Sequence, residues 1–125
     1  MTVTNLAISE FDVSLIPNGS KSRTRIVVGQ LPDGKPLSFP VMVVRGARAG
    51  KTLLATGAIH GDEFEGAVAI QDVFAKLDPF RMRGSFIGIP VVNGPAFLAG
   101  ARTGSHDNQD LARVFPGSID GSPTE

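Results

Sequence analysis

The sequence contains no cysteine, which excludes a disulfide framework and thiolate metal sites. It also has no tryptophan or tyrosine, so eight phenylalanines are its only aromatic residues. No apolar run approaches the roughly 18 residues that a transmembrane helix needs. Residues 1–15 lack the basic start and continuous apolar stretch of a signal peptide. We therefore expect a cytoplasmic protein in which any metal is held by His, Asp or Glu.

Neither sign of charge dominates the chain. Twelve basic residues balance twelve acidic ones, and no strong basic block is present. This balance argues against nucleic acid or an anionic membrane surface as the main partner. Hydrophobic residues make up 42% of the 125 residues, which is enough for one compact domain with a real core. The sequence leaves the oligomeric state open.

Short apolar runs predict several strands. They lie at 25–28, 39–44, 52–59 and 86–92. Residues 1–24 alternate weakly and are expected to form an edge strand or a hairpin arm. The run 52–59 is apolar at nearly every position, which is typical of a strand covered on both faces.

Between the last two runs the hydrophobic period changes. Apolar residues recur at three- and four-residue steps, which predicts an amphipathic helix over 63–77. The strand 52–59, this helix and the strand 86–92 form a β-α-β unit, which implies a right-handed crossover between parallel strands. Open α/β sheets carry their chemistry beyond the carboxyl ends of such strands. His60 follows one strand end, and Asn93 with the loop 94–115 follows the other.

His60 and Glu63 are candidate metal ligands. They are three residues apart, so both side chains can converge on one point if the helix begins near Gly61. Imidazole nitrogen and carboxylate oxygen are a normal zinc pairing. Alternatively, His60 caps a turn while Glu63 and Glu65 place negative charge at a helix N-terminus. Because H-x-x-E also occurs by chance, the pattern alone leaves both interpretations open.

Three further side chains belong to the loop beyond the last strand. Arg102 and Arg113 can grip a substrate carboxylate or stabilise an oxyanion, and the alternative is that they are simply solvated. His106 is expected to be a solvated loop residue. A less favoured hypothesis makes it the third ligand of a self-contained metal site.

The chain ends on Ser122-Pro123-Thr124-Glu125, which has the form of a helix start. Ser occupies the N-cap position, Pro the first helical position, and Glu stands three residues after the cap. We expect that the natural protein continues beyond this signal. The alternative is a polar tail.

Three blocks resemble a known family, the succinylglutamate desuccinylase/aspartoacylase family of zinc hydrolases related to the metallocarboxypeptidases. They are LLATGAIHGDEFEGAVAIQDVFAKLDP, GSFIGIPVVNGPAFLAGARTG and DLARVFPGSIDGSPTE. The resemblance covers roughly residues 40–125. It implies an incomplete α/β fold of the zinc carboxypeptidase type, with a mixed, largely parallel sheet and flanking helices. Residues 41–125 would be the N-terminal part of the hydrolase domain, and residues 1–40 a small N-terminal β extension.

The resemblance also implies a function. Zinc would be the cofactor, with His60 and Glu63 as two of its ligands. Arg102 would polarise the substrate carbonyl, and Arg113 would hold a substrate carboxylate. The reaction implied is hydrolysis of the amide of a small N-acyl amino acid, of the desuccinylase, aspartoacylase or deacetylase type.

The chain departs from the family pattern in three ways. Ala112 replaces an Asn, which removes a side-chain amide donor, and Asp110 stands where many close relatives have Asn. The family's third zinc ligand, a His, and its general-base Glu belong to positions beyond residue 125. We therefore expect this segment alone to be inactive. These departures motivate the alternative of a non-catalytic small-molecule-binding module on the same scaffold.

Overall fold

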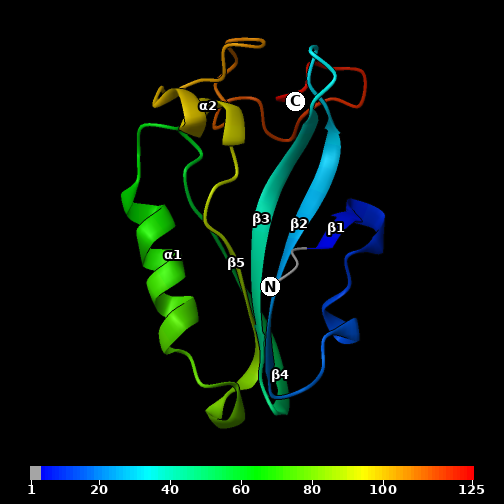
Figure 1. Ribbon diagram of the computed structural model, residues 1–125, viewed down its shortest axis with the longest axis vertical. Helices are drawn as coiled ribbons and strands as arrows, with labels where there is room; N and C mark the ends of the chain where they lie inside the picture. The colour runs from blue at the N-terminus through cyan, green and yellow to red at the C-terminus, as the bar shows by residue number, and fades with distance from the viewer. Residues whose placement is uncertain (1–3) are drawn as a thin grey trace.

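The computed structural model describes residues 4–125, with one sheet, two α-helices and three short 3₁₀ turns (Figure 1). The strands are β1 Thr4–Ala7, β2 Ser20–Gln30, β3 Pro36–Arg45, β4 Arg48–Thr56 and β5 Arg83–Ile89. The helices are α1 Glu65–Lys76 and α2 Gly94–Ala99. The 3₁₀ turns are η1 Ile8–Glu10, η2 Val13–Leu15 and η3 Pro79–Arg81. Residues 100–125, here called the polar cap, follow α2 and contain neither helix nor strand.

The sheet is mixed, with strand order β1-β2-β3-β5-β4. β1 pairs with β2, and β4 with β5, in parallel, whereas β3 is antiparallel to both β2 and β5. The prediction of a largely parallel sheet is therefore wrong, because antiparallel pairing predominates. The cause is a tight turn between β2 and β3, where the Gly34 amide donates to Leu31 O at 2.9 Å and Gly34 adopts a positive φ of 82°. Such a turn reverses the direction of the chain, so the two strands that it joins pair antiparallel.

The β-α-β unit is confirmed. β4 and β5 pair in parallel, and α1 lies between them in the chain. The strand and helix bounds differ from the predicted ones by a few residues, which is the usual uncertainty of element ends. The N-terminal segment contains an edge strand, as predicted, because β1 lies at the outside of the sheet. Its first strand, β1, pairs in parallel with β2, and two 3₁₀ turns then carry the chain across the sheet.

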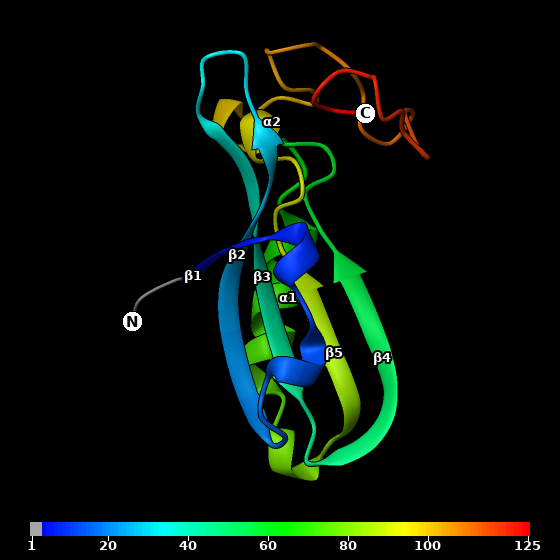
Figure 2. The same cartoon turned by 90° about the vertical axis from the view of Figure 1, so that its right-hand side faces the viewer.

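Each face of the sheet has its own apolar cluster. On one face α1 contributes Ile70 and Phe74, which pack against Val44 and Phe86. On the other face Ile26, Val41 and Val43 are buried beneath side chains of the N-terminal segment, which Figure 2 shows in front of the sheet. Those covering side chains are Leu6, Phe11, Val13 and Ile16. The resulting three layers hold the carboxyl ends of β4 and β5 at one edge.

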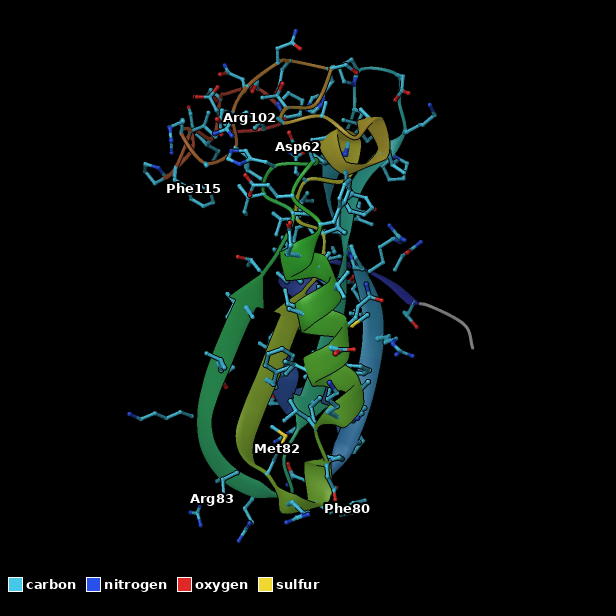
Figure 3. All side chains as sticks on the ribbon, turned by 90° about the vertical axis from the view of Figure 1, so that its left-hand side faces the viewer. Asp62, Phe80, Met82, Arg83, Arg102 and Phe115 are labelled. Atoms are coloured by element: carbon cyan, nitrogen blue, oxygen red, sulfur yellow. The ribbon has the colours of Figure 1, made fainter. Side chains whose placement is uncertain are left out.

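β4 differs from the prediction of a strand covered on both faces. Every residue of β4 except Ala55 is exposed. The reason is its place in the sheet. β4 is the outer strand, and α1 lies mainly over its neighbour β5 (Figure 3), so that Ala55 is the half-buried residue of β4 that packs against the cluster beneath the helix. Apolar composition therefore indicated a strand, but not what covers it.

Within residues 4–125 no helix is long and apolar enough to cross a membrane. β3 begins at Pro36 and joins β2 and β5 in one sheet, so the sheet is continuous across residue 40. The division into residues 1–40 and 41–125 stays a prediction.

Candidate metal and substrate site

The loop after β4 and the loop after β5 are bound to each other by backbone hydrogen bonds. The Gly57 amide donates to Ile89 O at 2.9 Å, and the Val92 amide donates to Gly57 O at 3.0 Å. A side chain at Gly61 would collide with the backbone of Ala96, so glycine there lets the loop pack closely against α2. These contacts fix the backbone on either side of His60.

Asn93 joins the same two loops through its side chain. Its Nδ2 donates to Ile59 O at 3.2 Å, and its Oδ1 accepts from the Ala96 amide at 3.2 Å, which caps α2. The residue is buried, so both polar ends are satisfied inside the protein. One side chain therefore ties the residue before His60 to the start of α2.

His60 and Glu63 meet as predicted from their spacing. The His60 ring is buried, and its Nδ1 lies 3.0 Å from Glu63 Oε1. The Glu63 side chain is exposed and reaches the ring from the loop that precedes α1. A nitrogen and an oxygen that can both donate a lone pair to a metal thus face each other beyond the carboxyl end of β4.

Asp110 is the residue that the sequence interpretation missed. Its Oδ1 lies 2.9 Å from His60 Nε2 and accepts from the Ala112 amide at 3.0 Å. Its Oδ2 accepts from Arg102 Nε and Nη2, each at 3.1 Å. Asp110 lies fifty residues from His60 in the chain, so no local spacing links the two. The signal available was its place in the DLAR segment, where we noted only the departure from Asn.

The charges in this cluster reinforce one another. The hydrogen bond to Asp110, and then that to Glu63, raise the pKa of His60 above its usual value. The same hydrogen bond with His60 lowers the pKa of Asp110. Without a metal, the arrangement therefore favours imidazolium between two carboxylates.

The two arginines are placed differently. Arg102 is half-exposed and joins His60 through the shared carboxylate of Asp110. Arg113 is exposed, and its backbone amide donates to Asp110 O at 2.8 Å. The structure therefore brings Arg102 into the cluster by its side chain, and Arg113 beside it by its backbone.

His106 is not the solvated loop residue that we expected. Its side chain is only 11% exposed, and its Nε2 lies 3.2 Å from Thr124 Oγ1 and 3.4 Å from Asp107 Oδ2. The cap folds back on itself at this point, which buries the ring. No set of three metal-ligating side chains is assembled within residues 4–125, so a self-contained site with His106 as third ligand is not formed there.

A cavity of about 410 Å³ lies between the β2–β3 hairpin and the polar cap. Phe39, Asn93, His106 and Thr124 are among the residues that line it. His60, Glu63 and Arg102 do not line this cavity. In the cluster around His60, the side chains of Glu63 and Arg102 are exposed, whereas the His60 ring is buried.

The chain is similar to known proteins. Residues 49–125 match the model of the succinylglutamate desuccinylase/aspartoacylase catalytic domain. Over 87 residues the chain is 45% identical to N-alpha-acetyl-L-2,4-diaminobutyric acid deacetylase from Halomonas elongata, covering 70% of this chain and 25% of that protein.

Two solved structures have the same fold. One is a succinylglutamate desuccinylase/aspartoacylase from Rhodobacter sphaeroides, with a TM-score of 0.79, 31% identity, and coverage of 91% of this chain and 35% of that one. The other is a product-bound ectoine utilization protein from Ruegeria pomeroyi, with a TM-score of 0.72, 36% identity, and coverage of 89% and 35%. The chain spans a quarter to about a third of the length of these relatives. It belongs to the succinylglutamate desuccinylase/aspartoacylase family.

Proposed function

We propose that this chain is the N-terminal part of a zinc-dependent hydrolase that cleaves the amide bond of an N-acyl amino acid. The observation that carries the proposal is the pairing of His60 Nδ1 with Glu63 Oε1 at 3.0 Å, beyond the carboxyl end of β4. Membership of the family supports it. So does the relative whose name states that it removes an acetyl group from an α-amino acid.

The residues present fit two positions of a zinc site. If Asp110 accepts the N–H of His60 Nε2, the imidazole keeps an unprotonated Nδ1 that faces Glu63. A His₂Glu site needs one more protein ligand, and residues 4–125 do not complete the set. The chemistry that zinc supplies at such a site is Lewis acidity toward the substrate carbonyl and acidification of water.

The arginines are assigned to the substrate. Asp110 holds the guanidinium of Arg102 beside His60, so a remaining N–H of that group can donate to the oxygen of the scissile carbonyl. Arg113 is exposed and can bind the free carboxylate of the amino acid. Because Ala112 has no side-chain amide, this carboxylate would depend on Arg113 more than in relatives with Asn at that position.

The test uses a joined protein, in which the portion of the Halomonas elongata deacetylase that follows its matched segment is attached after Glu125. We expect one zinc ion per chain and hydrolysis of at least one member of a panel of N-acetyl and N-succinyl amino acids. His60→Ala and Glu63→Ala should lose both zinc and hydrolysis. The matched control is Lys76→Ala, which breaks only an exposed ion pair with Asp72 on α1.

The alternative, a non-catalytic binding module, predicts a different result. The joined protein would bind an N-acyl amino acid without zinc, and His60→Ala would leave that binding unchanged. A protein that contains no zinc and hydrolyses no member of the panel would overturn the proposed function.

A further inference from the structure

Five basic side chains gather at the end of the sheet opposite the candidate metal and substrate site. They are Arg45 at the end of β3, Arg48 and Lys51 in β4, Arg81 at the end of η3 and Arg83 at the start of β5. Figure 3 shows Arg83 at this end of the molecule and Arg102 at the other. The five come from separate short segments, so no continuous basic run marks them in the sequence. The net charge of zero therefore conceals a local excess of positive charge.

These five charges are not balanced by neighbouring carboxylates. Within residues 4–125 none of them forms an ion pair with an aspartate or a glutamate. Arg48 stands directly opposite Arg83 in the ladder of β4 and β5, and like charges side by side on neighbouring strands repel each other. Arg48 Nη2 donates to Arg81 O at 3.4 Å, and this carbonyl does not neutralise the guanidinium. A single surface arginine is ordinarily solvated, but two in register are an arrangement that an anion would stabilise.

Arg45 is the half-buried member of this group. Its Nη1 donates to Val13 O at 3.2 Å, and to Ser14 O and Ile16 O at 2.5 Å each. These bonds occupy Nη1, so Nε and Nη2 keep N–H groups for a further acceptor. Asp12 is a weak partner, because its pKa is lowered first by hydrogen bonding with Ser14, and the charge of Arg45 is the smallest cause. Arg45 is therefore a positioned cation with unused donors.

A cavity of about 280 Å³ lies beside Arg45 and Arg48. The neutral side chains of Asn18 and Ser85 also line it, and both can donate hydrogen bonds. Among residues 4–125 no aspartate or glutamate contributes to its lining. Its volume is close to the lower limit of small-molecule pockets, which suits a small ligand. The cavity thus combines two guanidinium groups, neutral donors and no negative charge.

We propose that this cavity binds a phosphate group, either as the free ion or as part of a small phosphate ester. A phosphate group carries about two negative charges at pH 7 and at least three acceptor oxygens. It therefore matches two guanidinium groups and several neutral donors better than a carboxylate, which carries one charge. Arginine also binds phosphate with two parallel hydrogen bonds. A phosphate held there would offset the repulsion between Arg48 and Arg83.

Capping of the 3₁₀ turn η2 is a simpler explanation for Arg45 alone. It accounts for the three bonds from Nη1 to the carbonyl groups at the end of the N-terminal segment. It does not account for Arg48, which makes no contact of this kind with η2, or for the absence of carboxylates from the lining of the cavity. A bound anion explains both.

The first experiment titrates the 125-residue chain with sodium phosphate at low ionic strength and follows the amide ¹H and ¹⁵N shifts. We expect saturable binding of one phosphate per chain with a Kd of about 1 mM or lower. The shift changes should centre on residues 46–50 and 84–85. Binding that does not saturate, or shift changes confined to the polar cap near Arg102 and Arg113, would overturn the proposal. Because this readout needs no zinc and no substrate, it can fail while the proposed function stands.

The second experiment repeats the titration with Arg48→Gln. We expect phosphate binding to weaken about tenfold, because a charge-assisted hydrogen bond is lost. The matched control is Arg25→Gln, which removes an equal charge from an exposed position on β2 where Arg25 Nη1 donates to Ser38 Oγ. Binding to that variant should be nearly unchanged. Protection of the β2–β3 amides from exchange verifies that each variant is folded. An equal loss in both variants would mean that phosphate responds only to overall charge, which contradicts a site.

The last titrations identify the source of the phosphate group. Tighter binding of glycerol 3-phosphate than of inorganic phosphate assigns the cavity to a small ester, and the reverse assigns it to the free ion. Equal affinities mean that the phosphate group alone is recognised. Acetate that binds as tightly as phosphate, or a glutamate-rich peptide that binds more tightly, would overturn the assignment in favour of a carboxylate or an acidic protein segment.

Discussion

The sheet with α1 and the polar cap are held together by different forces. In the sheet, two apolar clusters lie on opposite faces, and backbone ladders join every strand. In residues 100–125 there is no ladder and no helix, and the chain is organised around the carboxylates of Asp107 and Asp110. The first region fixes where the strand ends lie. The polar cap determines which side chains lie together beyond those strand ends.

Asp107 and Asp110 in the cap each accept several hydrogen bonds. Asp107 accepts from Ser122 Oγ at 2.8 Å, and from the amides of Thr124 and Gln109 at 3.1 Å each. Asp110 joins His60, Arg102 and the Ala112 amide. Such networks order a segment locally, whereas burial of large apolar side chains contributes to the stability of the whole fold. Substitutions in the apolar clusters should therefore lower the stability of the whole fold. Substitutions in the cap should have smaller effects that are confined to nearby residues.

The largest effect is expected from Phe86→Ala in β5. Phe86 is buried in the cluster with Val44, Ile70 and Phe74, so its removal leaves a cavity between α1 and the sheet. We expect the free energy of unfolding to fall by about 3–5 kcal/mol, measured by denaturant titration. Phe80→Ala is the control, because Phe80 is exposed in η3. A similar loss in both variants would contradict the assignment of stability to the core.

The contrast between the regions also explains what the sequence could predict. Hydrophobic period gave the β-α-β unit, because α1 buries Ala67, Ile70 and Phe74 at helical spacing. The hydrophobic period could not predict that β3 is antiparallel to its neighbours, because this depends on which strands pair, and the strands look alike in sequence. It also could not give the exposure of β4, since apolar composition reports what a strand tolerates and not what covers it.

The sequence likewise predicted only some of the contacts in the candidate site. His60 and Glu63 are close in sequence, so their meeting followed from a three-residue spacing. The link from His60 to Asp110 crosses fifty residues and depends on how an irregular loop folds back. His106 was misjudged for the same reason, because its burial comes from Asp107 and Thr124 in that loop. Hydrogen bonds between distant polar residues leave no periodic trace in a sequence.

A smaller effect is expected at Asn93, which lies where the two regions join. Asn93→Ala removes the cap of α2 and the donor to Ile59 O. We expect a loss of about 1–2 kcal/mol in the free energy of unfolding. Asn93→Asp keeps the oxygen acceptor for the Ala96 amide and loses only the donor, so it should retain part of that stability. A loss as large as that of Phe86→Ala would mean that the loops contribute to the core more than the apolar clusters indicate.

Asp110→Ala should act on the cap and on the side chain of His60, and not on the sheet. It removes the acceptor shared by His60, Arg102 and the Ala112 amide, so residues 102–113 should exchange their amide hydrogens faster. The β2–β3 amides should keep their protection. Asp110→Asn is the matched control, since its amide oxygen still accepts one of these bonds. Loss of protection throughout the sheet would show that the two regions unfold as one unit.

The smallest expected effect is a change in pH dependence at Asp107. Burial raises the pKa of this carboxyl, but the hydrogen bonds from Thr124, Gln109 and Ser122 outweigh it and hold the pKa below its usual value. The ionised form therefore stabilises the folded cap. That contribution is present above the unfolded pKa of about 4 and is lost as the pH falls from there through the lower folded value. Asp107→Asn cannot titrate, so its stability should differ from that of the parent chain at pH 6 and approach it at pH 3. Denaturant titration at both pH values measures the difference. If the gap between the parent chain and Asp107→Asn stays constant with pH, Asp107 acts through its shape alone. The hydrogen bonds that hold the cap would then not depend on the charge of Asp107.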